Sequence, residues 1–133
     1  MSTYNGTLLI KDDLMAFKKF PAYFYCSESG NEPVRDWLLS LKDSDKKVIG
    51  EDLKKVEFGW PIGMPICRSI SSYKGLWEVR SNLSGGQIAR ILFTETSGKM
   101  ILLHGFIKKT NKTPKQDLEL ASKRMKEVKL NAK

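Results

Sequence analysis

Two arginines and a group of lysines are the residues whose types and spacing could do chemistry in this chain. Arg80 and Arg90 stand on either side of a short turn, on what the alternating pattern predicts to be two neighbouring strands. Lys108, Lys109 and Lys112 follow a third predicted strand. The planar fork of arginine matches the oxygens of a phosphate, and lysine adds point charge. If the three strands pair in order, these groups converge at one edge of a sheet and can bind a phosphate.

Such a cluster could also cleave RNA without a metal, because the 2′-hydroxyl of RNA is an internal nucleophile. The protein must then stabilise the charge that grows on phosphorus and supply a base and an acid. A lysine whose pKa is lowered by neighbouring positive charges could move a proton, and His104 and Lys112 are further candidates. Two alternatives stay open. Arg80 could pair with Glu78 or another surface carboxylate, and His104 could be a buried histidine of structural role.

Several other chemistries are excluded by the residues available. The chain has one histidine and neither a Cys-x-x-Cys nor a His-Glu-x-x-His spacing, so we expect no metal site. No glycine-rich phosphate loop precedes a helix, because Gly85 and Gly86 fall in a predicted hairpin turn. We therefore expect no cofactor.

The distribution of charge favours a polyanionic partner. The formal net charge is +8, and residues 99–133 carry ten Lys and Arg against three acids. A one-sided cationic surface attracts nucleic acid by neutralising phosphates and releasing counterions. Within this stretch we expect Lys112, Lys115, Lys123 and Arg124 to bind RNA or the ribosome. The alternative is a solvated helix face that lysine keeps soluble.

Length and composition describe one ordinary domain. The 133 residues are 41% hydrophobic and 29% charged, which is typical of a globular protein with a modest core. The sequence shows no secretory signal and no apolar stretch of bilayer length, so we expect a cytoplasmic protein without a membrane partner. Cys26 and Cys67 are expected to be reduced thiols.

The elements that must position the cationic groups follow from periodicity and turn signals. We expect a first strand at residues 20–26, helices at 33–41 and 44–59, strands near 76–80, 87–96 and 99–107, and a terminal helix opened by a capping box at Thr113. Short connections predict that the first two helices form an antiparallel hairpin and that the last three strands form a meander. The expected fold class is α+β: a two-helix hairpin packed on a small antiparallel sheet, with a C-terminal helix. Residues 1–19 are expected to be an extension of uncertain structure, and 20–133 the domain.

Four ordered blocks resemble a known family. They are residues 32–38 (EPVRDWL), 76–80 (LWEVR), 90–93 (RILF) and 103–114 (LHGFIKKTNKTP). In their order and spacing they resemble the phage-derived, HigB-like branch of the RelE toxin superfamily, over about residues 20–128. The resemblance implies a RelE-like fold, with helices packed on an antiparallel sheet.

The resemblance also implies a function and a partner. Members of that superfamily are ribosome-dependent mRNA endonucleases, made beside a helix-turn-helix DNA-binding antitoxin that neutralises them. Carried over residue by residue, the site would be Arg80, Arg90, Lys108 and Lys109. The chain departs from the best-known members by having Leu76 and Glu78 where they carry lysines. It also has no tyrosine after residue 73.

These departures keep two other functions open. One is a non-catalytic basic module that binds RNA or the ribosome on the same fold. The other is a protein-interaction module whose basic surface meets an acidic partner.

Overall fold

The computed structural model describes residues 18–108 and 113–131, and all structural statements below concern these residues. The elements, in chain order, are β1 (Ala22–Phe24), α2 (Pro33–Ser40), α3 (Asp43–Gly59), β2 (Cys67–Ser69), β3 (Trp77–Asn82), the 3-10 turn η1 (Ser84–Gly86), β4 (Ile88–Thr96), β5 (Lys99–Lys108) and α4 (Lys115–Asn131). Pro33 stands at the start of α2, where a missing N–H costs nothing. The α+β class and the main elements expected from periodicity are confirmed.

The sheet differs from the expected antiparallel one. Its five strands lie in the order β1-β5-β4-β3-β2, and β1 pairs in parallel with β5 while the other pairs are antiparallel. The expectation of a purely antiparallel sheet was therefore wrong, because the pattern of β1 shows a strand without showing its partner. The short edge strand β2 was not predicted, since three residues are too few for a visible alternation.

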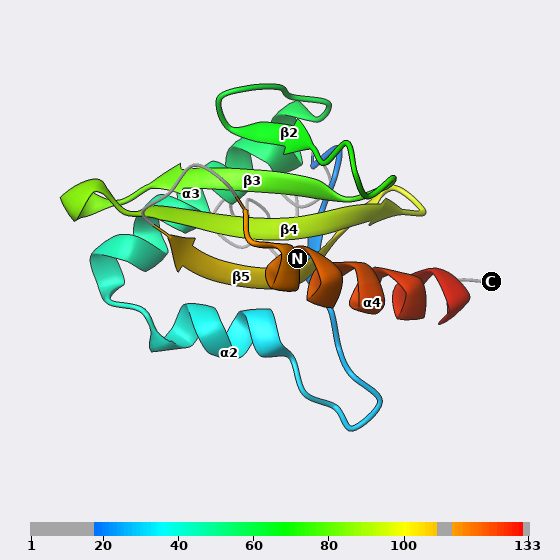
Figure 1. Ribbon diagram of the computed structural model, residues 1–133. Helices are drawn as coiled ribbons and strands as arrows, with labels where there is room; N and C mark the ends of the chain where they lie inside the picture. Colours follow the sequence, from blue (N-terminus) through cyan, green and yellow to red (C-terminus); the bar gives the residue numbers. More distant parts are fainter. Residues whose placement is uncertain (1–17, 109–112, 132–133) are drawn as a thin grey trace, which may run out of the picture.

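The arrangement of α2 and α3 also differs from the expected hairpin. α2 packs chiefly on β5 and α3 on β3, so each helix is held by the sheet more than by the other helix. The link between them is extended at Leu41 and Lys42, which sets the two helices at an angle (Figure 1). Short loops predict neighbouring helices, but here the apolar stripe of each helix faces the sheet.

The two faces of the sheet are covered by different helices. α2 and α3 cover one face, and α4 crosses the other over β4 and β5 (Figure 1). The face under α2 and α3 holds the larger core, which includes Val56, Val79, Ile91, Phe93 and Leu102. The face under α4 holds a smaller cluster around Leu76, Leu92, Leu103 and Ala121. Side chains alternate between the faces along each strand, so β4 contributes to both cores.

The beginning of the described chain is tied to the end of α3. Phe20 is buried and stacks on Trp60, with ring centroids 4.4 Å apart. The buried carboxylate of Glu57 accepts the Ala22 backbone N–H at 2.8 Å and lies 3.1 Å from the Lys18 ammonium. Of the expected extension at 1–19, residues 1–17 lie outside the described residues. No described helix is long and apolar enough to cross a membrane.

Candidate RNA-binding site

The register of β3, β4 and β5 places the predicted site residues in a grid on the sheet face that α4 covers. Three rows cross these strands: Asn82, Ile88 and Lys108; then Arg80, Arg90 and Phe106; then Glu78, Leu92 and His104. Lys108, Arg80 and Arg90 therefore lie in adjacent rows of one face. The expectation that the three strands pair in order is confirmed.

Lys108 and Arg80 lie in the first and second rows of this grid, counted from the turn η1. Lys108 is exposed at the end of β5. Arg80 is half-buried. Its register position is on the α4 side of the sheet, but Arg80 and Asn82 also border a cleft of about 610 Å³ that α3, which covers the other face, lines with Glu51 and Asp52. Because β4 lies between β3 and β5, the backbones of Arg80 and Lys108 are about 9.6 Å apart across the sheet and about 6.6 Å apart along it. Both side chains are long, so they can contact one extended ligand, such as an RNA strand, from two sides.

Arg90 occupies a different environment, because its side chain is completely buried. Its Nη1 donates to Thr113 Oγ1 at 2.9 Å and lies 3.8 Å from Glu78 Oε2, and Glu78 is also fully buried. Burial lowers the pKa of Arg90, and Arg80 and Arg68 lower it further, while Glu78 opposes the shift. The guanidinium therefore faces protein groups, between the sheet and the start of α4.

Glu78 is the centre of the buried network. Its Oε1 accepts from Arg68 Nε at 3.0 Å, and its Oε2 accepts from the Thr113 hydroxyl. Only Pro114 separates Thr113 from α4, so this network ties the start of α4 to β3 and β4. A buried carboxylate needs such partners, because an unpaired buried charge is strongly unfavourable.

His104 is held by α4 in the third row. Its Nε2 lies 2.7 Å from Asp117 Oδ1, in the first turn of α4, and its ring stacks on Phe106. Four strand residues separate His104 from Lys108, which corresponds to about 13 Å. The geometry favours the structural alternative for His104, as a second tie between the sheet and α4.

The residues of α4 that were predicted to bind RNA, Lys115, Lys123 and Arg124, fall into two groups. Lys115 and Lys123 are exposed. Arg124 instead donates from Nη1 to the Leu103 carbonyl at 2.8 Å and lies over the Tyr25 ring, and burial lowers its pKa. Lys109 and Lys112 lie outside the described residues. The exposed cations Lys115 and Lys123 can meet a polyanion, whereas Arg124 packs α4 onto the sheet.

Within residues 18–108 and 113–131, no group of three or more His, Cys, Asp or Glu could hold a metal ion.

Sequence comparison adds a family to this geometry. The model of the family described as phage-derived protein Gp49-like (DUF891) matches residues 36–126, about two thirds of the chain. The chain belongs to this family. It is a family of RelE/HigB-type, toxin-like proteins, which agrees with the resemblance of the four blocks at this coarse level. A search of curated proteins found no match.

Sequence reasoning named Glu78 only as a surface partner of Arg80, and it missed the roles of Asp117 and of the Thr113 hydroxyl in positioning the cations of this Gp49-like protein. Glu78 alternates with Trp77 and Val79 as a solvent-facing strand residue would, and Asp117 stands in an ordinary first turn of a helix. Thr113 was predicted to cap α4, but its hydroxyl donates to Glu78 and accepts from Arg90. One signal was available in the sequence. Glu78 and Arg80 lie two residues apart and therefore on the same face of a predicted strand. If a helix covers that face, the acid needs a buried partner.

Proposed function

We propose that this Gp49-like protein is the toxin of a type II toxin–antitoxin system and acts as a ribosome-dependent endoribonuclease on translated mRNA. The observation that carries the proposal is the family match over residues 36–126, together with Arg80 and Lys108 in adjacent rows of one sheet face. The proposed partners are mRNA on the ribosome and a helix-turn-helix antitoxin, and the proposed location is the cytoplasm.

In the proposed reaction the 2′-oxygen of one nucleotide attacks the adjacent phosphorus and the bond to the 5′-oxygen breaks. A base takes the 2′-hydroxyl proton and an acid protonates the leaving 5′-oxygen, so the products are a 2′,3′-cyclic phosphate and a free 5′-hydroxyl. Arg80, Lys108 and Lys109 would hold the phosphate and stabilise its growing charge. No metal takes part in these steps.

Arg90 would act in this reaction as a positioning residue. Its buried guanidinium contacts Thr113 and Glu78, and Thr113 begins the segment that leads into α4. The contacts of Arg90 with Thr113 and Glu78 would thereby set the distance between α4 and the strands that carry Arg80 and Lys108. Lys112, Lys115 and Lys123 would add contacts to ribosomal RNA.

The test is to induce the gene and map mRNA 5′ ends with and without active translation. We expect new 5′ ends only during translation, and we expect Arg80→Ala to lower cleavage by about 10² to 10³, the scale for losing one preorganised charge donor. Lys47→Ala, at an exposed lysine of α3, is the matched control and should cleave normally. Unchanged growth arrest in both Arg80→Ala and Lys108→Ala would contradict this site.

A non-catalytic RNA- or ribosome-binding module is the second candidate function. It is favoured by Leu76 and Glu78, which stand where the best-known members of the resembled superfamily carry lysines. Glu78 and Arg90 also neutralise each other in the buried network. Binding that falls steeply with salt, together with intact mRNA in translating extracts, would support this alternative.

A further inference from the structure

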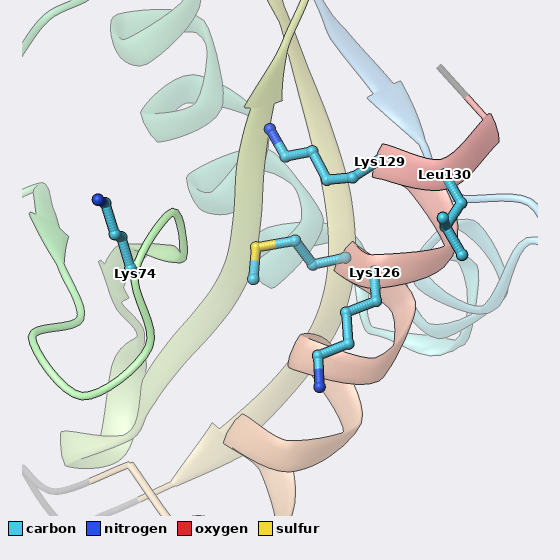
Figure 2. A pocket seen from close by; sticks show the side chains of 5 residues that line it. Lys74, Lys126, Lys129 and Leu130 are labelled. Carbon is cyan, nitrogen blue, oxygen red and sulfur yellow. The ribbon is translucent and has the colours of Figure 1, made fainter. Parts of the chain in front are cut away.

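A second surface lies along the C-terminal half of α4, away from the candidate RNA-binding site. It is a groove of about 430 Å³ between α4 and the loop that precedes β3, lined by Lys74, Met125, Lys126, Lys129 and Leu130. Figure 2 shows Lys74 on the loop, across the pocket from Lys126, Lys129 and Leu130 of α4. Met125 lies ten residues after Lys115, where α4 begins, which is about 15 Å along a helix axis. The groove therefore lies away from the end of α4 that contacts Glu78 and Arg90 through Thr113.

The groove is apolar inside and cationic at its rim. Met125 and the aliphatic stems of the lysines line it, and the Leu130 side chain is 68% exposed. Methionine adapts to partners of varied shape, and lysine can cover apolar surface while its ammonium stays in water. Leu130 belongs to the same lining, so its exposed side chain extends the apolar surface of the groove and does not stand alone on the helix.

The backbone conformation of the loop next to α4 requires a glycine at position 75. The φ of Gly75 is +89°, a conformation that residues with a side chain rarely adopt. A Cβ built there would make an ordinary contact with Met125 Sδ, at 3.5 Å, so Gly75 lies directly beside α4.

Within residues 18–108 and 113–131, the three rim lysines form no ion pair with a carboxylate. None of the ion pairs formed within the described part of the chain involves Lys74, Lys126 or Lys129, and the Lys129 ammonium donates to the backbone carbonyl of Glu95. The groove thus presents three positive charges around a carbon-lined centre.

We propose that this groove binds an acidic amphipathic peptide segment of a partner protein. Apolar side chains of the segment would enter between Met125 and Leu130, and its carboxylates would meet Lys74, Lys126 and Lys129. An RNA backbone would satisfy the ammonium groups but leave the apolar lining exposed, so the combination of lining and rim favours a peptide. The proposal goes beyond RNA cleavage and does not depend on it.

The experiment uses the full chain and a short fluorescein-labelled peptide of Leu and Glu, with leucines recurring along one helical face. We expect saturable binding by fluorescence anisotropy. Lys126→Glu/Lys129→Glu should weaken binding at least about tenfold, and Leu130→Ser should weaken it in the same direction. The control Lys47→Glu/Lys54→Glu makes the same charge change at exposed lysines of α3 and should bind as the parent protein does.

Three outcomes would overturn the proposal. They are the absence of saturable binding at about 1 mM peptide, equal binding of a scrambled peptide of the same composition, and binding of single-stranded RNA in the groove in place of the peptide. Growth arrest and mRNA cleavage, measured on the same groove variants, should stay at the parent level. Because those assays report on Arg80 and Lys108, a failure of peptide binding and a failure of RNA cleavage can be told apart.

Discussion

The two faces of the sheet are built from different chemistry, although the same strands supply both. Under α2 and α3 the face is aliphatic and aromatic, and Phe93 lies against both Phe20 and Trp60. Under α4 a smaller apolar cluster shares the face with the Glu78–Arg90–Thr113 network and the His104–Asp117 pair.

This difference separates stability from positioning. Burial of apolar area on the first face is non-directional, so it stabilises the fold without fixing any one group closely. Hydrogen bonds and ion pairs on the second face are directional and hold α4 at one place above the strands. A positioned helix is what a cationic site needs if its charges are to meet one phosphate.

The largest expected effect is on the polar face. Glu78→Ala leaves the buried Arg90 guanidinium without its carboxylate, and we expect a loss of about 3–5 kcal/mol in the free energy of unfolding, measured with urea. Glu28→Ala, at an exposed acid of the loop after β1, is the control and should stay close to the parent. In contrast, the double change Glu78→Leu/Arg90→Met should recover much of the loss, since no unpaired charge remains. If the double variant were destabilised as much as Glu78→Ala, the unpaired Arg90 charge would not be the cause of the loss.

The next largest effect is expected from overpacking the apolar face at Gly105, where the backbone lies close to Trp37. A Cβ added at Gly105 would lie 2.5 Å from two ring atoms of Trp37, so the helix α2 would have to move. We expect Gly105→Ala to lower the free energy of unfolding by about 3 kcal/mol, the upper range for overpacking. Trp37→Leu should make the same change less harmful when the two are combined. If the losses in the free energy of unfolding from Gly105→Ala and Trp37→Leu simply add in the double variant, the contact between Gly105 and Trp37 does not limit packing.

A smaller effect connects the polar face to activity. Thr113→Val keeps the shape of the side chain but removes the hydroxyl, and we expect a loss of about 2 kcal/mol because buried Glu78 and Arg90 each lose a partner. Thr113→Ser retains the hydroxyl and should rescue both stability and mRNA cleavage. If cleavage fell equally in the two variants at a temperature where both are folded, Thr113 would have no positioning role.

The smallest perturbation compares two thiols without changing the fold. Cys67 is buried on the apolar face and Cys26 is exposed. Burial, with a smaller contribution from Glu78, raises the pKa of Cys67 to about 12. We expect iodoacetamide at pH 8 to modify Cys26 in the native protein and to reach Cys67 only after unfolding, as peptide mass spectrometry would show. Equal native labelling would mean that this face is open to water.

The raised pKa of Cys67 also makes the free energy of unfolding decrease as the pH rises in the alkaline range. The folded state keeps Cys67 protonated up to about pH 12, whereas the unfolded state loses this proton at the ordinary pKa of cysteine. Its contribution to stability is therefore complete below the unfolded pKa and declines as the pH rises toward 12. Cys67→Ala should flatten that alkaline decline, which urea unfolding across this range would detect.

The sequence by itself determined the main elements other than the short strand β2, the strand order β3-β4-β5 and the family. These depend on local and repeated signals: alternation along the strands, the 3.6-residue period of α3 and α4, Pro33 at a helix start, and the four ordered blocks. A short turn between adjacent strands leaves one natural pairing, and this pairing brings Arg80 and Arg90 into the same row.

Only the tertiary structure decided how those arginines differ. Arg80 and Arg90 both lie on predicted strands beside the same turn, but Arg90 is fully buried under α4 whereas Arg80 borders a cleft. The parallel pairing of β1 with β5 and the hydrogen bond from Thr113 to Glu78 each join residues at least 35 positions apart, and the Thr113 bond helps to bury Glu78. No local pattern encodes such contacts, because they exist only after distant segments have packed together.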